Sequence, residues 1–230
     1  PIATKILGYY LLPTTAGTAD GRNNLPLINE KETLDYWSHT ARVDHNLSDN
    51  HRLFARVNGY RRESNYNNWF KNAATGEWFQ FISRGVALDD VYSASPTFVM
   101  NVRYGYNRFI GASDNHPDSR GFDLTTLGFP ASYNNAIDTA SRRFPQIVIS
   151  GYSGTYNGGL WRPTDIHTLN ATFDKVQASH NLKFGMEYRV YRENQLSPDN
   201  ITTGRFDFGE TYTRGPLDNS PAAPTGQGLA

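Results

Sequence analysis

The sequence predicts an all-β fold of about six long antiparallel strands in three hairpins, and three observations support it. Long segments alternate apolar and polar residues with a period of two, which is the pattern of strands with one apolar face. The connections alternate between tight turns and much longer stretches. Each predicted strand is about 10–14 residues long, whereas ordinary globular strands have about 5–6 residues.

Residues 1–33 are rich in Gly, Pro and Asn, and we expect them to be loop. The first hairpin covers 34–64, and its two strands carry their polar residues at even positions. Keeping these residues on one side of the hairpin requires an odd number of loop residues. A three-residue loop at 49–51 meets this condition and sets Asp44 opposite Arg56.

The second hairpin covers 81–110 and turns at 95–97, around a proline. This turn sets Asp89 opposite Arg103 on the polar side. The second strand of this hairpin carries its apolar residues at even positions, namely Phe98, Met100, Val102, Tyr104 and Tyr106.

The third hairpin covers 164–194 and turns at 177–180. Its register sets Asp174 opposite Lys183, so the turn and the charge pair agree. A long loop at 111–163 precedes it, and 195–230 is expected to be loop or extended chain. Local patterns inside the connecting segments suggest helical turns at 4–10 and 122–130 and short strands at 145–152 and 204–213.

Strand length and loop asymmetry together indicate a membrane protein. About 9–11 tilted residues cross a bilayer core, and the three tight turns lie on one side, with long connections at 65–80, 111–164 and 194–204 on the other. We therefore predict a partial antiparallel up-and-down transmembrane β-barrel with long extracellular loops. The residues expected to face lipid are Trp37, Val43, Val57, Val102, Tyr104, Phe173, Phe184, Met186 and Tyr188, and the charged pairs named above are expected to face the lumen.

The composition excludes several functions. Lys+Arg and Asp+Glu both number 22, so there is no basic excess for nucleic acid, and cysteine is absent. The six histidines have no ligand spacing, so we expect no metal and no cofactor. Asp89, Asp90 and Glu187 could be imagined as glycosidase carboxylates, but cross-strand pairing explains the charge positions, and we expect no catalytic residue and no enzyme.

Aromatic residues in the predicted loops are the candidate substrate contacts. They either bind a substrate such as a peptide or glycan, or pack the long loops together, and the second interpretation is favoured because loops of this length need a core. The residues are Trp69, Trp78, Tyr133, Tyr152, Tyr156 and Trp161.

Six segments, taken in order, resemble the barrel of large TonB-dependent receptors, closest to the Oar-like subgroup with a carboxypeptidase-regulatory-like N-terminal domain. They are RVDHNLS at 42–48, RLFAR at 52–56, ALDDVYSASP at 87–96, LGFP at 127–130, RFP at 143–145 and LKFGMEYR at 182–189. The resemblance implies a receptor in the bacterial outer membrane with a plug and a TonB-interacting segment. Residues 1–230 show neither, so we expect an internal barrel fragment whose partners are outer-membrane lipid, the remaining strands and plug, TonB through that plug, and a substrate. The alternative is a soluble β-sheet carbohydrate-binding module.

Overall fold

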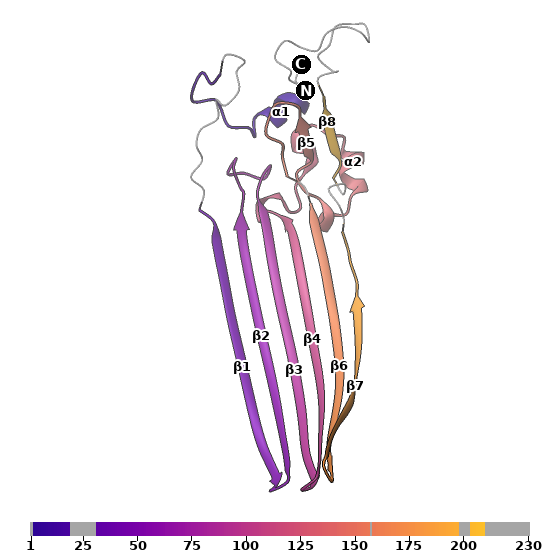
Figure 1. Ribbon diagram of the computed structural model, residues 1–230. Coiled ribbons are helices and arrows are strands. Elements are labelled where there is room, and N and C mark those ends of the chain that lie inside the picture. The colour runs from indigo at the N-terminus through magenta and orange to yellow at the C-terminus, as the bar shows by residue number, and fades with distance from the viewer. Residues whose placement is uncertain (1, 19–30, 157, 198–202, 210–230) are drawn as a thin grey trace, which may run out of the picture.

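The computed structural model describes residues 2–18, 31–156, 158–197 and 203–209. It consists of one tall antiparallel sheet with a smaller, irregular region at one end (Figure 1). Tight turns close the opposite end, and the first and last described residues, Ile2 and Gly209, lie on the side of the irregular region. The prediction of an all-β antiparallel fold is therefore confirmed, and the sheet is open rather than closed into a barrel.

Six long strands form the sheet in the order β1-β2-β3-β4-β6-β7, and each pairs with its sequence neighbour in the sheet as in an up-and-down arrangement. Five of them, at 16 to 19 residues, are longer than the predicted 10–14, because they continue beyond their regularly alternating stretches, chiefly on the loop side, and β7 has 14 residues. Their bounds are Thr33–Ser48 for β1, His51–Tyr66 for β2, Glu77–Ser95 for β3, Phe98–Asn115 for β4, Gly159–Gln177 for β6 and His180–Glu193 for β7.

The register of two hairpins is the predicted one. Asp89 lies opposite Arg103 between β3 and β4, and Asp174 lies opposite Lys183 between β6 and β7. In both hairpins the predicted turn is compatible with the observed register.

The register predicted for the β1–β2 hairpin is wrong by two residues. Asp44 lies opposite Phe54, and Arg56 lies opposite Arg42. Asp44 instead accepts hydrogen bonds from Arg42 on its own strand, at 2.6 and 2.8 Å. The turn is shorter than the predicted 49–51 loop, and a register shift between Asn46 and Ser48 supplies the extra residue, as in a β-bulge. The bulge keeps the predicted faces, because moving a strand by two residues preserves its alternation.

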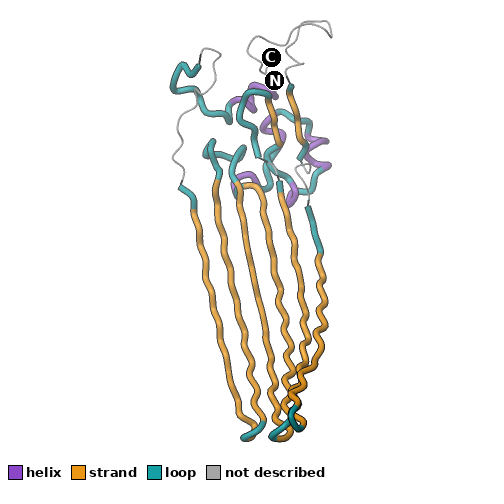
Figure 2. Tube along the Cα trace, viewed as in Figure 1, coloured by secondary structure: helices purple, strands orange, loops and turns teal. Residues whose placement is uncertain are grey.

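The remaining elements are short and lie at the loop end of the sheet (Figure 2). Strands β5 and β8 form a separate parallel pair, and the helical elements surround them. The bounds are Ile2–Leu7 for α1, Pro117–Ser119 for η1, Leu124–Leu127 for η2, Ala131–Ala136 for α2, Thr139–Ser141 for η3, Gln146–Ile149 for β5 and Arg205–Phe208 for β8.

These elements confirm the local patterns seen in the connections. Asp123 caps η2 and accepts hydrogen bonds from the Thr125 hydroxyl at 2.7 Å and the Thr125 amide at 3.0 Å, which lower the pKa of its carboxyl. The strand expected at 145–152 is β5, and the one expected at 204–213 begins with β8, although its last four residues lie outside the described part of the chain. The first 33 residues, predicted as loop, contain α1 and the first residue of β1.

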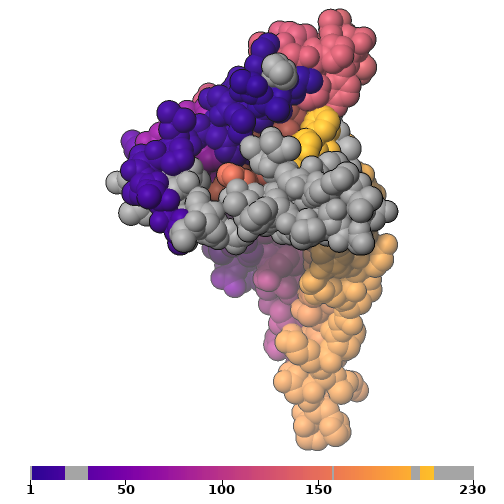
Figure 3. All heavy atoms as spheres, turned by 90° about the horizontal axis from the view of Figure 1, so that it is seen from above, coloured from indigo at the N-terminus to yellow at the C-terminus, as the bar shows by residue number. Residues whose placement is uncertain are grey.

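The buried hydrophobic core lies in the connections and not on the sheet. It brings together segments far apart in sequence, which we call the loop module: residues 2–18, 67–76, 116–156 and 203–209. Seen from the loop side, the indigo N-terminal segment lies alongside the pink connection between β4 and β6 (Figure 3). The core side chains are Ile6, Phe70, Ala74, Leu127, Phe144, Ile147 and Ile149.

Candidate functional site: the two faces of the sheet and the loop module

One face of the sheet carries apolar side chains in five successive rows, which we call the apolar band. Along β4 the band runs from Phe98 to Tyr106, nine residues, which matches the ~9–11 residues that cross a bilayer core. From the turns toward the loops, the rows are Phe98, Lys175 and Leu182; His51, Tyr92, Met100, Phe173 and Phe184; His45, Leu53, Asp90, Val102, Ala171 and Met186; Val43, Ala55, Leu88, Tyr104, Leu169 and Tyr188; and Ala41, Val57, Val86, Tyr106, His167 and Val190.

All nine residues expected to face lipid lie on this one face. Eight of them are exposed, from 37% for Tyr104 to 67% for Val43. Phe173 is half-buried, because its ring stacks on Phe184 at 5.3 Å. Trp37 lies on the same face but beyond the band on the loop side, where its ring packs over Gly59.

Several polar side chains in or beside the band have partners. His51 Nε2 lies 2.7 Å from Asp90 Oδ1. The Tyr104 hydroxyl lies 2.8 Å from His167 Nδ1, and Tyr106 donates to Asp165 at 2.6 Å. Each of these pairs gives a polar atom a hydrogen-bond partner. Without that partner, placing the atom in an apolar environment would cost free energy.

The opposite face is polar and charged. Asp89 is its most enclosed charged side chain among those with ion pairs, with 3% of the side chain exposed. It pairs with Arg103 and accepts a hydrogen bond from Asn101 at 2.9 Å. Lys183 and Asp174 also meet, at 3.6 Å, but both are solvated. A shallow hollow of about 300 Å³ lies on this face, where the small residues Gly85, Ala87 and Gly105 leave room between Arg56 and Arg103.

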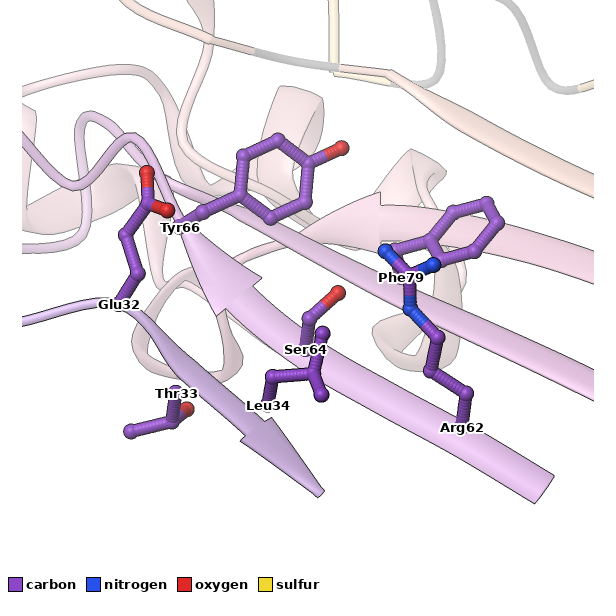
Figure 4. Close-up of a pocket in the computed structure, with 7 residues that line it drawn as sticks. All are labelled: Glu32, Thr33, Leu34, Arg62, Ser64, Tyr66 and Phe79. Atoms are coloured by element: carbon purple, nitrogen blue, oxygen red, sulfur yellow. The ribbon is translucent and has the colours of Figure 1, made fainter. Parts of the chain in front are cut away.

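A second depression, of about 350 Å³, lies at the loop end of β1 and β2 (Figure 4). The Arg62 guanidinium lies over the Phe79 ring there, 5.9 Å from its centroid. Because β1 is an edge strand, any strand that continues the sheet beyond it would border this depression. Its lining residues are Glu32, Thr33, Leu34, Arg62, Ser64, Tyr66 and Phe79.

The structure divides the candidate loop aromatics into two groups. Trp69 and Tyr152 are exposed on the loop module. Tyr133 stacks on Phe129 and donates to the Thr203 carbonyl at 3.1 Å, and burial raises the pKa of the Tyr156 hydroxyl. The last two therefore pack the module together, as the favoured interpretation proposed.

Trp78 and Trp161 were assigned to loops, and this assignment is wrong. They lie in β3 and β6, whose loop-side ends lack the regular alternation that marks the band. Trp78 donates from Nε1 to Glu63 Oε1 at 2.6 Å, and the Arg120 guanidinium lies 4.6 Å from the centre of its ring. Trp161 is exposed and bridges to Leu196 through backbone hydrogen bonds of 2.8 Å.

Two further observations concern metals and helices. Within the described residues, no three His, Cys, Asp or Glu side chains gather closely enough to hold a metal ion. None of the helices described is both long and apolar enough to cross a membrane.

Comparison with known proteins places the geometry in context. A family model described as an outer membrane beta barrel domain matches residues 1–230, the whole of the chain. Searches of curated proteins and of solved structures returned no match.

Proposed function

Because the chain belongs to the family of outer membrane β-barrel domains and its place is the bacterial outer membrane, we propose that it forms part of the wall of a transporter in that membrane. The apolar band faces lipid and the charged face lines the lumen. The observation that carries this proposal is the band itself. Its rows stay in register across six strands, and nine residues of β4 span it.

The transporter we propose is a TonB-dependent receptor. Three features support this assignment: the ordered resemblance of the six segments given above, the length of the strands beyond the band, and the large loop module on one side. In such a receptor the substrate enters from the loop side and the plug fills the lumen. Trp69 and Tyr152, which are exposed on the loop module, are then the candidate first contacts for a peptide or glycan.

The sheet needs further strands to function in this way. Its edges are β1 and β7, and outer-membrane barrels of this kind have at least about eight strands and no free edge. The strands that complete the wall, the plug and the segment that contacts TonB would belong to the rest of the parent chain, and no catalytic role is assigned.

A soluble carbohydrate-binding sheet is not favoured. It would need a second layer over the apolar band, and the elements that the structure describes gather at the loop end of the strands, away from the band. The arginine-lined hollow lies on the polar face of the sheet, and its charge suits a water-filled lumen.

Spin labels on the full-length protein in outer membranes test the proposal. Labels at Val43, Val102 and Met186 should be quenched by lipid-soluble oxygen, and labels at Asn101 and Glu187 by a water-soluble nickel complex. Val102 and Met186 are each matched by a neighbouring control on the other face, Asn101 and Glu187. The opposite accessibility, or water access at all five positions, would overturn the assignment of the faces.

A further inference from the structure

A row of arginines borders the apolar band on its loop side. It consists of Arg84, Arg108 and Arg192, which share one row of the sheet with Asp165 and lie on the same face as the band. Arg84 and Arg108 are direct cross-strand neighbours. Like charges in this position repel each other unless an anion lies between them.

The protein supplies too few anions for this row. Asp165 accepts from Arg108 at 3.1 and 3.2 Å and also from Tyr106. In the part of the chain that the structure describes, the guanidinium groups of Arg84 and Arg192 have no ion pair or hydrogen bond. Both residues are exposed. Three guanidinium groups therefore face one carboxylate, which leaves a net positive charge at the margin of the band.

More of the positive charge lies at the loop-side margin of the band than at the turn-side margin. On the loop side the next row contains Arg61, which is paired with Glu63 at 2.6 Å. The turn side contributes Lys175, whose Nζ lies 5.6 Å from the centre of the Phe98 ring. An arginine row at the boundary between apolar and polar surface suits phosphate, which a guanidinium binds with two parallel hydrogen bonds.

An apolar hollow lies on the same face, two rows nearer the turns. It has a volume of about 390 Å³ and is lined chiefly by Val43, Leu53, Leu88, Val102 and Tyr104 around the small side chain of Ala55. Tyr104 is four residues from Arg108 along β4, or about 13 Å at the rise of a strand. A lipid with its phosphate at the arginines would therefore extend an acyl chain toward the hollow.

We propose that Arg84, Arg108 and Arg192 bind a phosphate of an outer-leaflet lipid, and that the hollow holds one of its acyl chains. This inference rests on the proposed function, since it takes the apolar band to face lipid and the loops to lie outside. It adds a lipid site that fixes the height of the wall in the membrane, because the phosphate layer then coincides with one row of the sheet.

The test measures binding of lipid to the full-length protein, purified in detergent and delipidated. The probes are lipid A with both phosphates, the same lipid after dephosphorylation, and inorganic phosphate. We expect wild-type protein to bind the phosphorylated lipid about thirtyfold more tightly than the dephosphorylated one, because two of the three arginines have no carboxylate partner among the described residues and each contributes about 1 kcal/mol near an anionic headgroup. Equal binding of the two lipids would overturn the proposal without any variant, and so would inorganic phosphate binding as tightly as the lipid.

Two double variants test whether the preference for phosphorylated lipid depends on the arginine row. Arg84→Gln with Arg192→Gln should remove the preference for phosphate, whereas Arg52→Gln with Arg162→Gln should keep it. The control pair removes the same charge from exposed arginines on the opposite face. A preference that survives the first pair, or is lost in both, refutes the site.

A spin label at Val102 distinguishes a failure of the proposed lipid site from a failure of the proposed function. If that label reports lipid and the phosphate preference is absent, the arginine site alone is wrong. If the label reports water, the assignment of the faces is wrong, and the lipid site is refuted with it.

Discussion

A charge placed at the middle of the apolar band should destabilise the wall more than the same charge elsewhere. Met186 is the most direct position, because it lies in the third of the five rows and is 61% exposed. On a lipid-facing barrel surface, an arginine costs about 2–4 kcal/mol at the bilayer midplane and about 0–1 kcal/mol near the interfaces. Met186→Arg should therefore cost about 2–4 kcal/mol, and Leu182→Arg, in the first row, about 0–1 kcal/mol.

The assay is equilibrium unfolding of the full-length protein in lipid vesicles, followed by tryptophan fluorescence. Thr172→Arg is the matched control, because Thr172 lies next to Ala171, in the row of Met186, but points to the polar face. It should change the free energy of unfolding by less than about 0.5 kcal/mol, as surface substitutions generally do. Equal costs for Met186→Arg and Thr172→Arg, or a larger cost for Leu182→Arg, would refute the assignment of the band to lipid.

Three further predictions test the packing of the sheet and the loop module. Arg103→Ala should cost about 1–3 kcal/mol in the same unfolding assay, because the enclosed Asp89 carboxylate loses its cation and keeps the hydrogen bond from Asn101; a loss below about 0.5 kcal/mol contradicts this. Gly185→Ala should cost about 1–3 kcal/mol, since a Cβ there would clash with the backbone oxygen of Ala171 in β6, whereas Gly105→Ala, with nothing within 4 Å, should be tolerated. Burial raises the pKa of Tyr10 to about 12 from 10.0, so its contribution to stability is present below pH 10 and lost as pH rises toward 12; Tyr10→Phe should remove this dependence, measured as the unfolding free energy against pH, and the absence of a difference between the two proteins above pH 10 would contradict it.

The sheet was the predictable part of the fold, for a physical reason. Alternation with a period of two assigns each residue of a strand to a face, and a tight turn then limits the register to few choices. A predicted charge pair did not decide the register by itself. The register was correct at Asp89 and Arg103, and it was wrong by two residues at Asp44 and Arg56. In the first hairpin the alternation fixed only which residues share a face, and so left registers that differ by two residues open. A bulge near Leu47 keeps those faces in place of the expected three-residue loop.

The loop module was not predictable in the same way. Its contacts join residues such as Ile6, Phe70 and Phe144, which are far apart in sequence and follow no period. The local sequence of β5 likewise does not indicate that this strand pairs with β8 in a short parallel pair. The sequence therefore did not distinguish the packed Tyr133 from the exposed Tyr152, and it assigned Trp78 and Trp161 to loops although they lie in strands.

The distribution of apolar residues between these two parts is itself an argument about the surroundings of the protein. The loop module buries its apolar side chains, as a protein in water does, with Leu127 and Phe144 fully enclosed. The sheet does the reverse and exposes its apolar side chains over five adjoining rows, such as Val43, Met186 and Tyr188. A patch this continuous promotes aggregation when it faces water, whereas in lipid it has no such cost. One chain that follows both rules in adjoining regions is suited to two solvents, and the arginine row lies at the boundary between them.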